Sequence, residues 1–153
     1  MREMRKNNRQ MTQAETESML ESGEYGFLAV MGDENYPYAV PLSYAYENGV
    51  IYFHSAKEGH KLDGMRGHSK VSFSLVGKTE VLPGKFSTKY ESVIVFGQAV
   101  EIEGEEKRIG LMALIRKYSP DFLEKGGQYV SHSEEDTIVV KIIIDHMTGK
   151  ARR

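Results

Sequence analysis

The segment from Val50 to Leu62 carries the residue types that an anion site needs. A run of strand-forming residues ends at Ser55, a short polar turn follows, and Gly59-His60-Lys61 begins the next expected helix. The first amides of a helix lack intrahelical partners and carry partial positive charge, so they bind anions. Basic side chains in a first turn oppose the helix dipole, which favours a negative group beside them. The segment therefore predicts a phosphate site, although a solvated basic turn explains the pattern equally well.

The other polar residues give weaker signals of chemistry. His54 lies near the end of the same strand, where a lone histidine is more often a hydrogen-bonded packing residue than a ligand. The spacing of His54, His60 and His68 matches no familiar metal site, so we expect no metal. The chain has no dinucleotide-binding glycine loop, no P-loop and no G-x-S-x-G elbow. No catalytic acid, base or nucleophile is therefore identified.

The composition excludes several classes of protein. The chain has 153 residues and no cysteine, which rules out a disulfide scaffold, a thiolate zinc site, an iron–sulfur cluster and a cysteine nucleophile. This length predicts a single domain over residues 1–153 with a core of its own. It is too short for a cofactor domain plus a catalytic domain, so any redox chemistry must come from a bound cofactor.

The charges are nearly balanced but unevenly placed. Twenty Lys and Arg against 22 Asp and Glu give a net charge of −2, which offers no general attraction for nucleic acid or for an anionic membrane. Basic residues crowd both ends, and we expect residues 1–10 and 150–153 to be flexible tails. No apolar run is long enough to cross a bilayer or to form a signal peptide, so a cytoplasmic protein is expected.

Two helices are indicated by their sequence signals. Thr12 and Glu15 form a capping box, and the helix that they begin should end near Ser22, before Gly23. Residues 105–118 carry apolar side chains at helical spacing. Both helices are expected to cover a sheet rather than to carry chemistry.

Strands joined by turns make up most of the remaining pattern. The pair Asn48-Gly49 predicts a tight hairpin, and Gly97 inside a strand predicts a bulge or a close backbone approach. Residues 79–90 have no regular pattern and are expected to form a long loop. The expected strands cover residues 25–31, 37–46, 50–55, 71–76, 92–102 and 137–144. Six strands connected in this way favour a mainly β (α+β) domain, an antiparallel barrel with a few peripheral helices, over a parallel sheet.

Six short motifs occur in order along nearly the whole chain. They are Pro37-Tyr38-Ala39-Val40-Pro41-Leu42, Ile51-Tyr52-Phe53-His54-Ser55-Ala56, Gly59-His60-Lys61-Leu62, Tyr90-Glu91-Ser92-Val93-Ile94-Val95-Phe96-Gly97, Glu106-Lys107 and Thr148-Gly149-Lys150. Together they resemble the Nim-like branch of the pyridoxamine 5′-phosphate oxidase-related FMN-binding proteins, which is named for 5-nitroimidazole resistance proteins. The set is specific, whereas any one motif alone is a weak signal.

The resemblance implies a six-stranded antiparallel split β-barrel that forms a homodimer and binds FMN at the subunit interface. Ser55, His60 and Lys61 would hold the FMN phosphate, in agreement with the anion site inferred from the residues themselves. His54 and Ala56 would lie along the ribityl and phosphate end of the cofactor.

The resemblance also assigns residues to the ring of the flavin. The backbone of Val40, Pro41 and Leu42 would run beside the isoalloxazine ring, and Ser92 would approach from the partner subunit. Many relatives carry a cysteine where this chain has Ser72, so thiol chemistry is excluded there. The substrate signatures of the true oxidase are not recognisable, which argues against that activity.

The expected function is that of an FMN-dependent reductase, which passes electrons from reduced flavin to a small, electron-poor substrate of the nitroaromatic type. The alternative is a flavin- or haem-binding sensor or carrier that does not turn over. A nucleic-acid-binding barrel that uses the basic ends is disfavoured by the net charge of −2.

Overall fold

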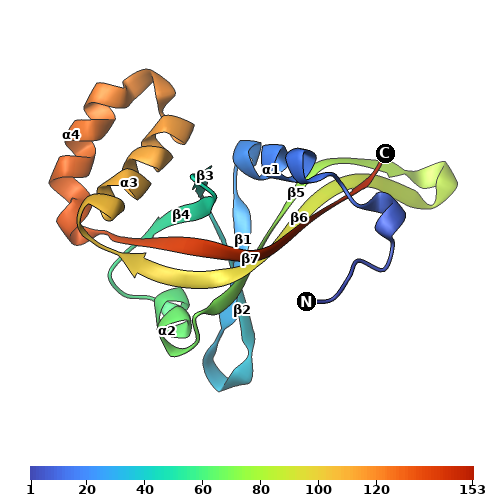
Figure 1. Ribbon diagram of the computed structural model, residues 1–153, viewed down its shortest axis with the longest axis horizontal. Helices are drawn as coiled ribbons and strands as arrows, with labels where there is room; N and C mark the ends of the chain where they lie inside the picture. Colours follow the sequence, from blue (N-terminus) through green and yellow to red (C-terminus); the bar gives the residue numbers. More distant parts are fainter.

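A single curled antiparallel sheet forms the body of the protein. The computed structural model describes all 153 residues. The strands are β1 (Gly26–Met31), β2 (Pro37–Leu42), β3 (Ala45–Glu47), β4 (Val50–Ser55), β5 (Lys70–Leu82), β6 (Ser87–Ile102) and β7 (Ile138–Arg152). They pair in the order β2-β1-β5-β6-β7-β4-β3. The edge strands β2 and β3 do not pair with each other, so the sheet is a split barrel, as the resemblance implies (Figure 1).

Helices cover the two faces and one end of this sheet. They are α1 (Gln13–Ser22), α2 (His60–Gly67), α3 (Gly104–Tyr118) and α4 (Leu123–Ser133). The predicted capping box is confirmed at its first bond, since the Glu15 N–H donates to Thr12 Oγ1 at 3.1 Å. Helix α1 ends at Ser22 as predicted and buries Leu20 completely. It thereby closes one end of the curled sheet.

The core lies inside the curl, and a second apolar layer lies outside it. Alternate residues of the strands, such as Phe53 and Phe73, point inward and are fully buried. On the opposite face of β4 and β7, the α3–α4 pair packs over Tyr52 and Val139. Gly110 permits this approach, because a Cβ there would lie 2.9 Å from the Tyr52 ring.

The number of strands is seven rather than the six expected. The apolar run predicted as one strand over residues 37–46 is two strands, β2 and β3, with a break between them. The N–H of Tyr44, in this break, donates to Tyr118 Oη at 3.0 Å instead of to a neighbouring strand. A hydrogen bond to a side chain 74 residues away ends the ladder, and no local pattern signals it.

The expected loop over residues 79–90 is wrong, because these residues form a projecting hairpin arm. Strand β5 continues past a bulge between Val76 and Thr79, and β6 begins at Ser87. Opposite charges face each other across the arm at Glu80 and Lys89, an arrangement that stabilises a strand pair. The arm extends away from the body (Figure 1), so both of its faces are solvated and the apolar alternation of a half-buried strand is missing.

Residues near both ends take part in backbone pairing, while the expectation that residues 1–10 and 150–153 are flexible tails stays a prediction. Strand β7 runs to Arg152, and Gln10 forms a β-bridge with Lys150. The last residue, Arg153, forms ion pairs with Glu15 and Glu91. The backbone around Gln10 therefore meets the end of β7 at the base of the hairpin arm.

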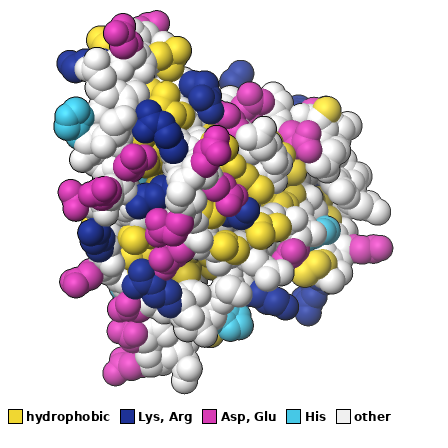
Figure 2. Space-filling model, turned by 60° about the vertical axis from the view of Figure 1, so that its left-hand side comes forward, with side chains coloured by type: hydrophobic (Ala, Val, Ile, Leu, Met, Phe, Trp, Pro, Cys, Tyr) yellow, Lys and Arg dark blue, Asp and Glu magenta, His cyan; other side chains and the backbone are white.

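The surface over the helical layer carries charges of both signs. On the side that brings α3 and α4 forward, carboxylates and basic side chains are interspersed around an apolar stretch (Figure 2). None of the helices combines the length and the apolar character that crossing a bilayer requires.

Candidate functional site

The strand–turn–helix segment that predicted an anion site has the expected form. Strand β4 ends at Ser55, which is buried between its neighbours and pairs with Ile138 of β7. The Ser55 hydroxyl donates to the carbonyl of Ala56 at 2.9 Å, which leaves its oxygen free to accept. An exposed turn beginning at Ala56 then leads into α2.

The N-terminus of α2 is open. Gly59 is its N-cap residue, with φ 157° and ψ 162°, a conformation that is essentially restricted to glycine. No side chain caps the helix, and the first helical bond joins the Asp63 N–H to the Gly59 carbonyl. The N–H groups that precede Asp63 are therefore free for an external acceptor. This glycine is needed for its backbone, since a Cβ would meet no other atom within 4 Å.

Lys61 supplies a positive charge that nothing in the chain neutralises. Its side chain is half-buried and takes part in none of the ion pairs of the protein. It lies close enough to His54 to affect that side chain. Partial burial, and then the Lys61 ammonium, lower the pKa of His54 and keep its imidazole neutral. The segment thus holds one free cation beside a neutral histidine.

His60 has a structural partner that the sequence does not reveal. Its Nε2 atom accepts a hydrogen bond from the Asp33 N–H at 3.1 Å, and its ring packs on Tyr38 with centroids 4.1 Å apart. In this contact Nε2 is the acceptor, which leaves Nδ1 to donate. The same Nε2 lies 3.8 Å from the Asp33 carboxylate.

The same contacts join α2 to the β1–β2 hairpin. Gly64 lies against β1, where a Cβ would meet Met31 O and Val30 Cγ2, each at 2.7 Å. The sheet order separates β2 from β4, but this packing places the hairpin beside the turn that follows β4. Tyr38 is therefore a residue of the site for which the sequence gives no local signal, because its partner His60 lies 22 positions away.

The residues predicted to line the flavin ring lie on β2, an edge strand. Val40 and Leu42 are half-buried against the core, while Pro41 is exposed opposite Phe27 of β1. One edge of β2 has no partner strand. Backbone groups on that edge are free to hydrogen-bond with a ligand.

Ser92 lies outside this site within one chain. It pairs with Lys150 of β7, whereas Ser55 pairs with Ile138 of the same strand. The twelve residues between these two positions correspond to about 40 Å along an extended strand. The prediction that Ser92 reaches a flavin from a partner subunit stays a prediction.

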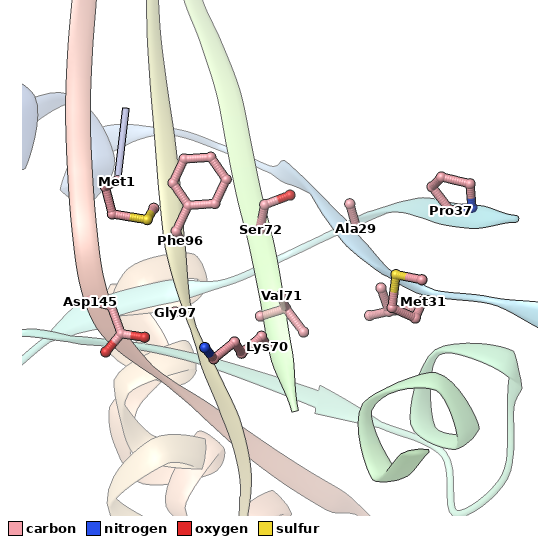
Figure 3. A pocket seen from close by; sticks show the side chains of 11 residues that line it. Met1, Ala29, Met31, Pro37, Lys70, Val71, Ser72, Phe96, Gly97 and Asp145 are labelled. Carbon is pink, nitrogen blue, oxygen red and sulfur yellow. The ribbon is translucent and has the colours of Figure 1, made fainter. Parts of the chain in front are cut away.

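Ser92 does lie on an exposed face of the sheet that is unusually apolar. Phe27, Met31, Ile94 and Phe96 point outward from it and are 44%, 47%, 44% and 41% exposed. A groove of about 340 Å³ crosses this face, with Ala29, Ser72 and Phe96 side by side from β1, β5 and β6 (Figure 3). In β6 both faces are apolar over residues 93–96, a pattern typical of a strand covered on both sides.

No group of three or more histidine or carboxylate side chains is placed to hold a metal ion. The site therefore consists of the α2 amides, Lys61, Ser55, His54, His60 and the edge of β2. This set can bind and orient an anionic ligand. It contains no paired acid and base.

One protein family matches nearly the whole length of the chain. The profile of the family described as pyridoxamine 5′-phosphate oxidase matches residues 12–151. No curated protein matches the chain.

Solved structures share the fold over almost the full length. A crystal structure of a candidate 5-nitroimidazole antibiotic resistance protein from Bacteroides thetaiotaomicron is 27% identical, with a TM-score of 0.80 over 93% of this chain and 86% of that one. An FAD- and haem-binding protein from Mycobacterium smegmatis is 18% identical, with a TM-score of 0.84 over 95% and 74% of the two chains. A flavocytochrome from Azotobacter vinelandii is 19% identical, with a TM-score of 0.82 over 99% and 72%.

Proposed function

The chain belongs to the pyridoxamine 5′-phosphate oxidase family, and on that premise we propose that it binds FMN and passes electrons from the reduced flavin to a small, electron-poor substrate. A nitroaromatic compound is the proposed substrate class, since a structure that is 27% identical comes from a candidate 5-nitroimidazole resistance protein. The observation that carries the proposal is the open anion site at the start of α2.

The phosphate end of FMN fits the residues of this site. The uncapped α2 amides and the unpaired Lys61 ammonium offer hydrogen-bond donors and positive charge to a dianion. The free lone pairs of Ser55 would accept from a ribityl hydroxyl, and the Nδ1–H of His60 remains as a further donor. His54 and Ala56 border the same turn. A neutral His54 donates one hydrogen bond without adding charge.

The ring of FMN would lie along the free edge of β2. The backbone groups of Val40 and Leu42 can meet the polar edge of an isoalloxazine ring, while Pro41 lacks an N–H and offers only a carbonyl and an apolar surface. When bound, the flavin supplies the electron transfer, and the protein supplies binding, orientation and exclusion of water. With no cysteine in the chain, no thiol competes for the electrons.

We further propose that the protein is a homodimer joined through its exposed apolar sheet face. Monomeric proteins rarely leave several large apolar side chains together in water, and Phe27, Met31, Ile94 and Phe96 share this face. A symmetric pair would use the same face of both subunits and hold two equivalent sites. Ser92 of each subunit would then face the flavin of the other. Sedimentation of a single monomeric species that still binds FMN would contradict the dimer.

The proposal is tested by flavin binding. The absorbance spectrum of the purified protein shows which cofactor is bound. Titration with FMN and with riboflavin then gives the part of the binding affinity that is due to the phosphate. Replacing Lys61 with Gln should weaken FMN binding by about tenfold to a hundredfold, the size of a charge-assisted hydrogen bond, and leave riboflavin binding unchanged. Lys125→Gln, on the exposed surface of α4, is the matched control and should change neither affinity.

Two results would count against the proposal. A protein that shows no flavin absorbance and takes up no FMN is not a flavoprotein. Equal losses of FMN and riboflavin affinity in Lys61→Gln would remove Lys61 from the phosphate site.

A second candidate function is cofactor binding without turnover. Structures with the same fold include a flavocytochrome and an FAD- and haem-binding protein, and no paired acid and base lies in the site. The same spectrum distinguishes haem from flavin. A bound flavin that no nicotinamide cofactor reduces, in a protein that consumes no nitro compound, would favour this function over the reductase.

A further inference from the structure

The backbone around Gln10 meets the C-terminal end of β7 at the base of the hairpin arm. Gln10 bridges Lys150, and the Met11 N–H donates to the Gly149 carbonyl at 2.8 Å, which brings Arg9 beside the end of β7. Tyr90 of β6 pairs with Arg152 of β7 two residues further along. Cross-strand partners share a face of a sheet, as do residues two apart on a strand. Tyr90, Lys150 and Arg152 therefore lie on one face.

Three cations at this place have no carboxylate partner. Arg9, Lys150 and Arg152 are half-buried and belong to none of the ion pairs of the protein. Arg152 donates only to the Thr88 carbonyl, at 3.3 Å. The neighbouring Arg153, in contrast, is bound by two carboxylates. The local acids are therefore already occupied, and positive charge remains on the other three side chains.

The Tyr90 hydroxyl lies among these cations. The Lys150 ammonium is 5.7 Å from the centre of the Tyr90 ring. Hydrogen bonding from Lys150, and then from Arg9, lowers the pKa of Tyr90. The Tyr90 oxygen accepts from these cations, and its O–H can still donate to a nearby anion.

A groove opens at the same position. It has a volume of about 430 Å³ and lies beside Arg9 and Lys150 rather than being lined by them. Its lining joins Tyr90 and Arg152 to Lys78 and Lys89 of the arm, to Arg153 and to the carboxylates Glu80 and Glu91. Glu80 faces Lys89 across the arm and neutralises it. This excess of positive charge contrasts with the net charge of −2 of the whole chain and with the mixed signs over α3 and α4 (Figure 2).

We propose that Arg9, Tyr90, Lys150 and Arg152 form a second anion site, which binds the phosphate group of a small molecule other than the flavin. A phosphate dianion has enough charge and enough acceptor oxygens to engage three cations and a phenol, whereas a single guanidinium satisfies a carboxylate. Ser55 pairs with Ile138, which lies twelve positions before Lys150 on β7, about 40 Å along an extended strand, so the two sites are distinct within one chain. Lys150 pairs with Ser92, so across the proposed dimer the two sites are told apart by filling the flavin site with FMN.

The test is calorimetric titration of the full chain, saturated with FMN, with inorganic phosphate at constant ionic strength. We expect one phosphate per chain. Lys150→Gln and Arg9→Gln should each weaken binding by about tenfold or more, as the loss of a charge-assisted hydrogen bond does. Arg9 precedes the sheet, so this variant retains the fold even where Lys150→Gln does not. The control Lys85→Gln removes an equal charge at the arm tip and should have no effect.

The outcomes separate this site from the proposed flavin site. Phosphate binding that survives both Lys150→Gln and Arg9→Gln, or no binding at all, overturns the second site. Binding that only Lys61→Gln removes assigns the anion to the flavin site and also overturns it. Binding of single-stranded RNA in place of phosphate, lost in Lys150→Gln, would make the surface a nucleic-acid site and the proposal wrong. Phosphate binding that depends on Lys150 in a chain that takes up no FMN supports the second site and refutes the flavin proposal alone.

Discussion

Replacing Gly64 with Ala tests whether the packing of α2 against β1 builds the candidate site. A methyl group at Gly64 would lie 2.7 Å from both Met31 O and Val30 Cγ2. One of these atoms belongs to the backbone of a paired strand, so it cannot move aside by changing a rotamer. The helix must lift away from the sheet instead.

The size of the effect follows from two opposed contributions. Forcing an extra carbon into a packed contact destabilises a protein by about 1–3 kcal/mol, while alanine in place of glycine stabilises a helix by about 0.5–1 kcal/mol. For Gly64→Ala we expect a net loss of about 1–2 kcal/mol, which for a chain of this length lowers Tm by about 3–6 °C. FMN affinity should also fall, because His60 moves with the helix away from Tyr38.

Gly67→Ala is the matched control in the same helix. A Cβ at Gly67 meets no atom within 4 Å, and its φ is not in the left-handed region. Only the helix-propensity gain remains, so this variant should be more stable than the parent by about 0.5 kcal/mol. Urea unfolding followed by circular dichroism measures both variants. If Gly64→Ala is as stable as Gly67→Ala, then α2 is not pressed against β1 and the account of the site is wrong.

Two further predictions concern the cluster where α3 meets the end of β2. Tyr118→Phe should lower the free energy of unfolding by about 1–2 kcal/mol, because the buried Tyr44 N–H loses its acceptor; the exposed Tyr129→Phe should have no effect in the same urea titration. Burial lowers the pKa of Lys117 from 10.5 to about 8, so the unfolded chain binds more protons than the folded chain between these values. Thermal unfolding should therefore show stability rising with pH over this window more steeply in the parent than in Lys117→Gln, and equal slopes would contradict the assignment.

Local patterns predicted the elements whose signals lie within a few residues. The Thr12 capping box, the Asn48-Gly49 turn with both φ angles positive, and the bulge at Gly97 all occur as expected. Each rests on backbone chemistry that neighbouring residues decide. The uncapped start of α2 at Gly59, beside the unpaired Lys61, is likewise a property of a continuous segment, and its binding of an anion stays a proposal.

Features that depend on distant partners were not predictable in this way. The hairpin arm has no apolar alternation, since solvent reaches both faces, and a register of opposite charges between Glu80 and Lys89 replaces it. The contact between His60 and Tyr38 has no local signal. It depends on how α2 packs on a hairpin that precedes it in the chain.

The sequence by itself determined the class of fold, the family motifs and the strand–turn–helix segment proposed to bind an anion, because these depend on residue types at short spacing. The tertiary structure alone decided which distant residues meet. It brought the backbone at Gln10 to Lys150, close to Tyr90, and so placed basic residues from both ends of the chain together. The physical reason is that the residues of β7 form hydrogen bonds with β4 and β6, which are distant in sequence. The packing of the whole sheet therefore determines which residues lie side by side.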